Sequence, residues 1–236
     1  MALLGVIGGL GPMATAYFMQ LVTSITDAKT DQDHIRMLIY SAPDIPDRTE
    51  YILGLSDRSP LPGIVSAGQA LVSMGADVIA IPCITAHCFH SEIESRIPVK
   101  ILNAIRDSAS LLSESGVRSV GLMATEGTVR TGLFQRELEQ KGISLLLPDE
   151  EDQRAVTSLI YNDVKRGGVP DMDSFFHIKE GLLGKGAEVV LLGCTELSVI
   201  KRDFDVGPAI LDVMEVLAYS SIAACGKHAR NNPVIF

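Results

Sequence analysis

Two cysteines occupy matching positions in a segment that this chain carries twice. The first copy runs Gly75-Ala-Asp-Val-Ile-Ala-Ile-Pro-Cys83, and the second runs Gly186-Ala-Glu-Val-Val-Leu-Leu-Gly-Cys194. In each copy the cysteine lies eight positions after the glycine, behind an apolar run. A short apolar run of this kind predicts a buried strand. The repeat therefore predicts two thiols at equivalent ends of two equivalent strands.

The setting of these two cysteines favours chemistry over packing. Cysteine often serves as a small buried hydrophobe, and we interpret Cys88 and Cys225 in that way. Cys83 and Cys194 are instead each predicted at a strand-to-helix corner, where a helix N-terminus favours the thiolate. Two opposed thiols could take a proton from one face of a carbon and supply one to the other face. Such a pair inverts the carbon without a metal or pyridoxal phosphate, and backbone N–H groups or threonine hydroxyls could stabilise the carbanion.

Strands and helices alternate along the chain. Apolar runs predict strands over 3–8, 35–40, 77–81, 98–103, 120–124, 143–147 and 188–192. Helical patterns are expected over 13–27, 63–74, 84–95, 104–115, 129–141, 149–166, 172–185 and 213–225, with 208–212 opening the last helix. Prolines predict a stiff polar loop over 41–49. Alternation of this kind is typical of parallel sheets covered by helices.

The repeat extends beyond the cysteine segments. Two further pairs match, namely Gly5…Gly11 with Gly121…Gly127 and the segment 98–103 with 208–212. We therefore predict an α/β fold of two pseudo-symmetric, doubly wound parallel-sheet subdomains. Ligands of such sheets bind beyond the carboxyl ends of the strands, and both cysteines lie there. The sequence thus predicts an active site in the cleft between the subdomains, a common place for small-molecule sites.

Composition narrows the class of protein. The 236 residues are 47% hydrophobic and 21% charged, which is typical of a globular protein. A net charge of −9 without a basic run argues against nucleic acid or an anionic membrane surface as a partner. No apolar run reaches transmembrane length, and the N-terminus lacks the basic start of a signal peptide. Four cysteines in a chain of this length indicate free thiols in a reducing, cytoplasmic setting.

One pattern in the sequence suggests a dinucleotide, and the signal is weak. Gly9-x-Gly11-x-x-Ala14 follows a predicted strand and precedes a predicted helix, as in dinucleotide-binding proteins. The second strand, however, ends near 40–42 without the acidic residue that binds the ribose. A glycine-rich turn also simply allows a ligand to approach the backbone. We therefore expect no cofactor.

A second pattern contains residue types that bind metals. Cys83-x-x-x-His87-Cys88-x-His90 brings thiols and imidazoles together, but Cys88 and His90 project away from the face that Cys83 and His87 share on a helix. No second ligand cluster completes a site, so we expect no metal. We interpret His87 either as a residue that orients or polarises the site or as a core histidine with its hydrogen bonds made.

Two basic residues are candidates for binding an anionic substrate. Arg48 follows the second strand in a Pro-Asp-Arg-Thr loop, from which its guanidinium could hold a carboxylate through two hydrogen bonds. Lys165 ends a predicted helix beside Arg166, where a cation complements the helix dipole. Position alone favours that structural role for Lys165.

Three longer motifs stand out, namely Ile7-Gly-Gly-Leu-Gly-Pro-Met-Ala-Thr15, Pro82-Cys-Ile-Thr-Ala-His87 and Gly193-Cys-Thr-Glu-Leu197. Together they resemble the signatures of the aspartate/glutamate racemase family, the cofactor-independent amino-acid racemases. The similarity covers essentially the whole chain. It implies two α/β subdomains related by a pseudo-twofold, usually assembled as a homodimer, with the C-terminal helix returning to the first subdomain. On this basis we place the first subdomain at 1–103 plus 209–236 and the second at 104–208.

The resemblance also implies roles for individual residues. It makes Cys83 and Cys194 the acid/base pair, and it places Arg48 and Lys165 on the side-chain carboxylate of an acidic amino-acid substrate. Other positions match residues that line the family's pocket, namely Leu10, Ile84, Thr85, Thr125, Thr195 and Glu196. The implied activity is that of a cytoplasmic, pyridoxal-independent racemase of aspartate or glutamate.

One position departs clearly from the family's pattern. The family typically has Asn after the first cysteine, where it contacts the polar α-substituents of the substrate, and this chain has Ile84. Leu10 is a milder change, because it replaces a frequent Met. Two alternatives stay open: an isomerase or decarboxylase of a non-amino dicarboxylate on the same scaffold, like a maleate isomerase, and a non-catalytic protein that binds an acidic metabolite.

Overall fold

Two four-stranded parallel sheets form the framework of the computed structural model, which describes residues 2–231. The first sheet has the order β2-β1-β3-β4, and the second has the order β6-β5-β7-β8. The strands are β1 (Leu4–Gly8), β2 (Met37–Ser41), β3 (Val78–Ala80), β4 (Lys100–Ile101), β5 (Ser119–Met123), β6 (Ser144–Leu146), β7 (Val189–Leu192) and β8 (Ile210–Asp212). The predicted α/β class with two parallel sheets is confirmed, and β3 and β7, which carry the doubled segment, hold equivalent places.

The described chain divides into two compact units. Residues 2–104 and 214–231 belong to the first unit, and residues 105–213 form the second. The helices associated with the first sheet are α1 (Pro12–Ile25), η1 (Asp31–Asp33), α2 (Arg48–Ile52), α3 (Leu61–Ser73), η2 (Ile84–Phe89), α4 (His90–Glu94) and α11 (Val213–Ala224). Those of the second are α5 (Ala104–Glu114), α6 (Glu126–Thr131), α7 (Leu133–Glu139), α8 (Glu150–Ser158), η3 (Leu159–Val164), α9 (Met172–Gly184) and α10 (Thr195–Asp203).

The second unit ends later than the boundary at 209 that the sequence suggested. Residues 210–212 do not open a helix but form β8, which pairs in parallel with β7. The reason is burial, because Ile210, Leu211 and Asp212 are all buried at the edge of the second sheet. The first unit therefore resumes at 214 rather than at 209.

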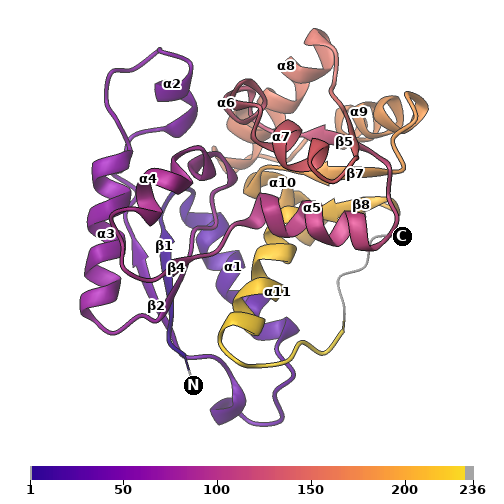
Figure 1. The fold of residues 1–236 in the computed structure, drawn as a ribbon. Coiled ribbons are helices and arrows are strands. Elements are labelled where there is room, and N and C mark those ends of the chain that lie inside the picture. The colour runs from indigo at the N-terminus through magenta and orange to yellow at the C-terminus, as the bar shows by residue number, and fades with distance from the viewer. Residues whose placement is uncertain (1, 232–236) are drawn as a thin grey trace. The chain divides into compact units, whose positions relative to one another are not determined.

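The last helix of the chain lies against the first one. Figure 1 shows α11, in yellow, beside the indigo α1 within the first unit. The backbone after α11 is hydrogen-bonded to the end of α1, because Asp27 N donates to His228 O at 2.9 Å and Arg230 N donates to Ile25 O at 2.8 Å. The two ends of the described chain thus complete one unit.

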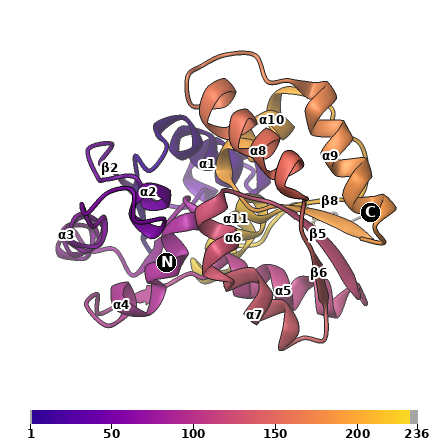
Figure 2. The same ribbon diagram turned by 90° about the horizontal axis from the view of Figure 1, so that it is seen from above.

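Helices cover both faces of the second sheet. In Figure 2, α5 and α7 lie on one side of the strands, and α8, α9 and α10 lie on the other. Each unit has its own apolar core. Cys83 belongs to the core cluster of the first unit, and Cys194 belongs to that of the second. No helix among the described residues is long and apolar enough to cross a membrane.

The glycine that begins each doubled segment ends a helix. Gly75 follows α3 with φ of 96°, and Gly186 follows α9 with φ of 102°, a backbone conformation that glycine adopts without steric cost. The amide after each glycine donates to a carbonyl four residues before the glycine, at Leu71 and at Leu182. The repeat therefore reproduces the helix end, the turn and the strand that leads to the cysteine.

Three predicted helices differ in detail from the structure. The helix after Cys83 is a 3₁₀ helix, η2, before it continues as α4. The helix expected over 129–141 is split into α6 and α7 at Gly132, whose backbone has the left-handed helical conformation. The helix expected over 149–166 ends in a π-helix, η3. Residues of the expected loop 41–49 also differ, because α2 already begins at Arg48, capped by the Asp47 carboxylate.

Candidate active site

Cys83 is the last residue before η2, at the carboxyl end of β3. Its backbone is extended, with φ of −152° and ψ of 101°, and its carbonyl accepts a hydrogen bond from Ala86 N at 3.1 Å. That bond spans three residues and explains why η2 is a 3₁₀ helix rather than an α-helix. Cys83 is only 4% exposed, and the adjoining Ile84 and Thr85 are buried as well. The structure therefore presents Cys83 at a helix entry inside an enclosed corner.

His87 links this corner to the neighbouring one. Its Nδ1 is 3.1 Å from the carbonyl oxygen of Cys83, and its Nε2 is 3.2 Å from the amide nitrogen of Ala104, the first residue of α5. Burial lowers the pKa of His87 to about 4. The hydrogen bond to the Cys83 carbonyl raises the pKa, and the nearby His90 lowers it further. The imidazole is therefore neutral above about pH 5.

The glycine-rich loop after β1 is fixed by a threonine that the sequence analysis did not single out as functional. Thr15 Oγ1 accepts a hydrogen bond from Gly9 N at 2.9 Å and donates one to Gly11 O at 2.9 Å. A Cβ atom at Gly9 would lie 2.4 Å from the backbone nitrogen of Ala42, so the loops after β1 and β2 approach too closely for any side chain there. The signal was in the sequence, because Thr15 ends the first family motif.

Arg48 joins the same two loops from within. Its Nη2 donates to Leu10 O at 2.6 Å, and its Nη1 donates to Pro46 O at 3.1 Å and to Ile45 O at 3.4 Å. The side chain is buried. The structure thus shows a guanidinium held by backbone carbonyls, a role that the carboxylate-binding hypothesis did not foresee. The planar fork of arginine suits this task, since one group can donate to both loops.

In the second unit, Cys194 is the residue before α10, at the carboxyl end of β7. Its extended backbone, with φ of −142° and ψ of 134°, matches that of Cys83, and its carbonyl accepts the first hydrogen bond of the helix from Leu197 N. The thiol donates to Glu196 Oε2 at 3.0 Å, and the Thr195 hydroxyl donates to the same oxygen at 3.3 Å. All three residues are buried. The second corner therefore pairs its thiol with a carboxylate.

This environment favours the protonated form of Cys194. Burial raises the pKa of the thiol well above its usual value, and the charge of Glu196 and the hydrogen bond to its carboxylate raise it further. The ammonium of Lys165 and the Glu196 amide act in the opposite direction and lower the pKa. Lys165 follows the π-helix η3, which packs against α10, and its Nζ lies 3.9 Å from the centre of the Tyr161 ring. A π-helix often occurs at a functional site.

Thr125 begins the loop-to-helix corner after β5, the strand beside β7. Its Oγ1 accepts a hydrogen bond from Thr128 N at 3.2 Å and donates to Thr128 Oγ1 at 3.0 Å. Gln153, which the sequence analysis missed, donates to the preceding carbonyl of Ala124 at 3.0 Å. No local pattern could have signalled Gln153, because its partner lies 29 positions away.

The predicted site residues fall into two groups, one in each unit. The first unit holds Leu10, Arg48, Cys83, Ile84 and Thr85, and the second holds Thr125, Lys165, Cys194, Thr195 and Glu196. Within each group, the residues lie on corners that follow the carboxyl ends of adjacent parallel strands, or on helices packed there. Within residues 2–231, no three His, Cys, Asp or Glu side chains gather closely enough to hold a metal ion. His87 and His90 direct ring nitrogens at backbone groups instead.

A comparison with protein families decides the class of this protein. The model of the Asp/Glu/Hydantoin racemase family matches residues 7–220. The chain belongs to this family. It is therefore an isomerase, a racemase, and the resemblance seen in the three sequence motifs is confirmed.

Known proteins agree with that assignment. The aspartate racemase of Picrophilus torridus is 33% identical with a TM-score of 0.83, covering 98% of this chain and 96% of that protein. The broad specificity amino-acid racemase RacX of Bacillus subtilis is 24% identical over 225 residues, which are 94% of this chain and 97% of that protein. An aspartate racemase homologue of Pyrococcus horikoshii, 24% identical, has the same fold, with a TM-score of 0.77 over 96% of this chain and all of that protein.

The buried His87 makes the stability of this racemase depend on pH. The folded-state pKa of about 4 lies below the ordinary value of 6.5, so the unfolded chain takes up the proton first as the pH falls. The contribution is intact above pH 6.5 and is lost as the pH falls towards 4. We expect the free energy of unfolding to decrease by ~3 kcal/mol across this window from His87 alone.

Urea denaturation of the wild type and of His87→Gln at several pH values measures this effect. The variant is less stable throughout, but its free energy of unfolding should change less between pH 6.5 and pH 4. Groups far from this ring contribute equally to both proteins, so the difference reports the ionisation of His87. Equal slopes in the two proteins would contradict the assignment of a buried neutral imidazole.

The carboxylate of Glu196 should control the reactivity of Cys194. Glu196→Gln keeps the shape of the side chain but removes its charge, so the pKa of the Cys194 thiol should fall. Alkylation of Cys194 by iodoacetamide at fixed pH should accelerate by about tenfold for each unit by which the pKa falls. Mass spectrometry of the Cys194 peptide gives the rate, and the rate at Cys83 in the same sample is the control. An unchanged or slower rate at Cys194 would refute the pairing.

Proposed function

We propose that this racemase inverts the α-carbon of aspartate, or of a related acidic amino acid, by proton transfer between Cys83 and Cys194. The observation that carries the proposal is the equivalence of the two thiols. Each cysteine follows the third strand of a four-stranded parallel sheet. Each has an extended backbone and directly precedes the first turn of a helix. A racemase needs an acid and a base that exchange roles with direction, and duplicated corners supply such a pair.

In the proposed reaction, one cysteine starts as a thiolate and the other as a thiol. The thiolate removes the α-proton, which leaves a carbanion and a new thiol. The second thiol then donates its proton to the opposite face of the carbon and becomes the thiolate. No proton is gained or lost overall, and the reverse reaction begins from the state that the forward reaction leaves.

The surroundings of the two sulfurs differ, and this difference supports an assignment of the starting state. The Cys194 thiol donates to the Glu196 carboxylate, an interaction that requires the proton on sulfur. We therefore assign the thiol of the resting pair to Cys194 and the thiolate to Cys83. In this scheme Glu196 is a partner of the acid rather than a residue that holds the substrate.

Two cations support an acidic substrate in a chain whose net charge is −9. The guanidinium of Arg48 lies at the loops after β1 and β2, and the ammonium of Lys165 interacts electrostatically with Cys194. That interaction favours a role at the site for Lys165, beyond the helix-end role suggested by its position. We propose that these two cations hold the side-chain carboxylate. Thr85, Thr125 and Thr195, with the amides at the two helix entries, are proposed to stabilise the carbanion.

We also propose a homodimer in the cytoplasm. The assembly rests on the family resemblance, and the location rests on the four free cysteines, Cys83, Cys88, Cys194 and Cys225. Light scattering of the purified protein at micromolar concentration measures the assembly directly. A monomer would remove that part of the proposal and leave the assignment of the two thiols unchanged.

Solvent exchange tests the reaction itself. Incubation with L-aspartate or D-aspartate in deuterated water should produce the opposite enantiomer with deuterium at the α-carbon, as read by NMR and chiral chromatography. Cys83→Ser and Cys194→Ser should each abolish inversion, because the two steps need different sulfurs. Full inversion by either variant would rule out the two-base scheme. Absence of exchange with every acidic amino acid, together with turnover of maleate or a malonate, would instead place the protein among dicarboxylate enzymes.

Ile84 should lower the catalytic efficiency for amino-acid substrates. Its buried, apolar side chain follows Cys83 where the family typically has Asn, so the substrate's amino group lacks one polar contact there. We expect Ile84→Asn to raise kcat/KM across a panel of amino acids, aspartate included, by about tenfold, the value of one hydrogen bond to a charged group. The same panel of amino acids is measured with Ile84→Val as a control that stays apolar. An equal change in both variants would show that size, and not polarity, matters at this position.

A further inference from the structure

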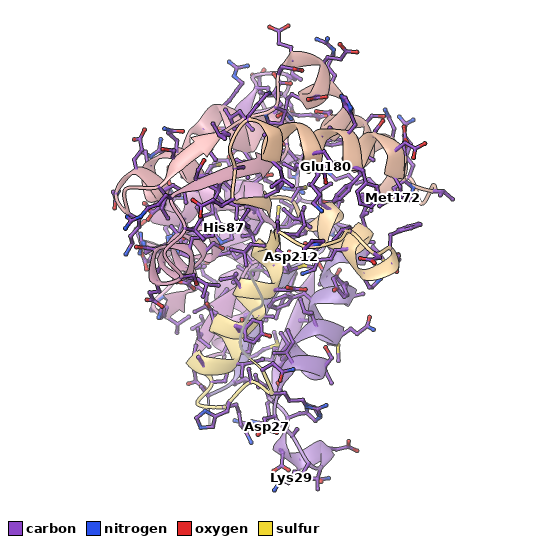
Figure 3. The ribbon with its side chains drawn as sticks, turned by 90° about the vertical axis from the view of Figure 1, so that its right-hand side faces the viewer. Asp27, Lys29, His87, Met172, Glu180 and Asp212 are labelled. Atoms are coloured by element: carbon purple, nitrogen blue, oxygen red, sulfur yellow. The ribbon has the colours of Figure 1, made fainter. Side chains whose placement is uncertain are left out.

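His87 makes two hydrogen bonds whose directions can be assigned from their partners. The Ala104 amide is a donor, so Nε2 must accept with its lone pair. A neutral imidazole then carries its proton on Nδ1, which donates to the carbonyl oxygen of Cys83. One buried ring with one tautomer therefore spans two backbone groups that are separated by 21 positions in the sequence. Figure 3 labels His87 among the side chains of the chain.

The two groups that the ring joins belong to adjacent corners of the first sheet. Cys83 follows β3 and begins η2, and Ala104 follows β4 and begins α5, while β3 pairs directly with β4. The first amides of a helix have no partner within the helix. The imidazole supplies a partner for one of them and uses its opposite nitrogen to hold the residue that carries the thiol.

We propose that His87 is a positioning residue for Cys83, which acts by fixing the corner after β3 to the start of α5 so that the sulfur keeps one direction. This inference rests on the proposed role of Cys83 as an acid/base group. The carbonyl of Cys83 already accepts a hydrogen bond from Ala86 N, so His87 is not needed to satisfy it. Its second bond adds a constraint on the peptide plane next to the Cα atom of Cys83.

His90 provides a matched comparison on the same stretch of chain. It is also a buried histidine, and its ring stacks on that of His87 with centroids 6.2 Å apart. Its Nε2 bonds to the carbonyl oxygen of Ile101 at 3.2 Å, and its Nδ1 lies 3.9 Å from the Glu94 carboxylate. Loss of His90 removes a buried histidine, its stacking on His87 and a backbone hydrogen bond, but it leaves both hydrogen-bond partners of His87 in place.

Two substitutions separate the two hydrogen bonds by which His87 bridges Cys83 and Ala104. The amide of His87→Asn occupies the position of Nδ1 and can donate to Cys83, but it cannot reach Ala104. The amide of His87→Gln occupies the position of Nε2 and can accept from Ala104, but it leaves the Cys83 carbonyl with its single backbone donor. Either variant breaks the bridge, so a variant that fails to fold is replaced by the other. His90→Gln is the control.

The rate of alkylation of Cys83 is measured without substrate, in a Cys88→Ser background. That background leaves Cys83 as the single thiol of its tryptic peptide, between Arg58 and Arg96. Because Cys83 is buried, release of the corner should raise its alkylation rate by about fivefold, as expected for the loss of one buried hydrogen bond. His90→Gln should leave this rate unchanged, even if it lowers the thermal midpoint as much as the His87 variants do.

In the His87 variants turnover should fall, whereas the alkylation rate of Cys83 rises. We expect kcat for aspartate to fall about tenfold to a hundredfold in the His87 variants, with KM nearly unchanged, because a misdirected sulfur affects the proton transfer and not substrate binding. A decrease in both alkylation and kcat would show that His87 activates the thiol and would overturn the positioning role. Equal behaviour of the His87 and His90 variants would reduce His87 to a structural residue. If the wild type does not act on aspartate, the proposed function fails by itself, and the alkylation contrast still decides the role of His87.

Discussion

The parallel pairing of β3 and β7 with their neighbours is the constraint on which the site depends. Each of these strands lies between two others that run in the same direction, so the carboxyl ends of at least three strands meet at one edge. The chain must turn from strand to helix at that edge, and the turn leaves amides without partners. A thiol at such a turn is close to those amides without any special arrangement of side chains. The sheet order thus accounts for the position of both cysteines.

The two corners use the same backbone but different polar partners. In the first unit the partner of the corner is His87, which acts on the carbonyl of Cys83 and leaves the sulfur alone. In the second unit the partner is Glu196, which accepts directly from the sulfur. A carboxylate beside a buried thiol opposes ionisation, whereas a neutral imidazole on the backbone adds no charge. Pseudo-symmetry of the fold therefore coexists with asymmetry in the chemistry of the two arms.

Sequence alone predicted the periodic parts of this structure well. The doubled segment located β3 and β7, and the family motifs identified the racemase class, because both depend on local patterns. Features that depend on distant partners were missed: Ile210 became part of a strand because β7 was available to pair with it, and Arg48 found three carbonyls from two separate loops. The hydrogen bond from Gln153 to Ala124 and the one from Ala104 to His87 were missed for the same reason, because their partners are distant in the sequence. The irregular helices η2 and η3 also escaped prediction, since their hydrogen-bond spacing does not alter the pattern of apolar residues.

The return of α11 to the first unit affects how the protein can be synthesised. A ribosome produces residues 2–104 first, then the whole of the second unit, and only afterwards the segment 214–231 that belongs with the first. The hydrogen bonds from Asp27 to His228 and from Arg230 to Ile25 can form only at that late stage. The second unit, contiguous from 105 to 213, has all its residues available earlier. The first unit is thus completed after the second, and until then α1 in the nascent chain has no α11 to pack against.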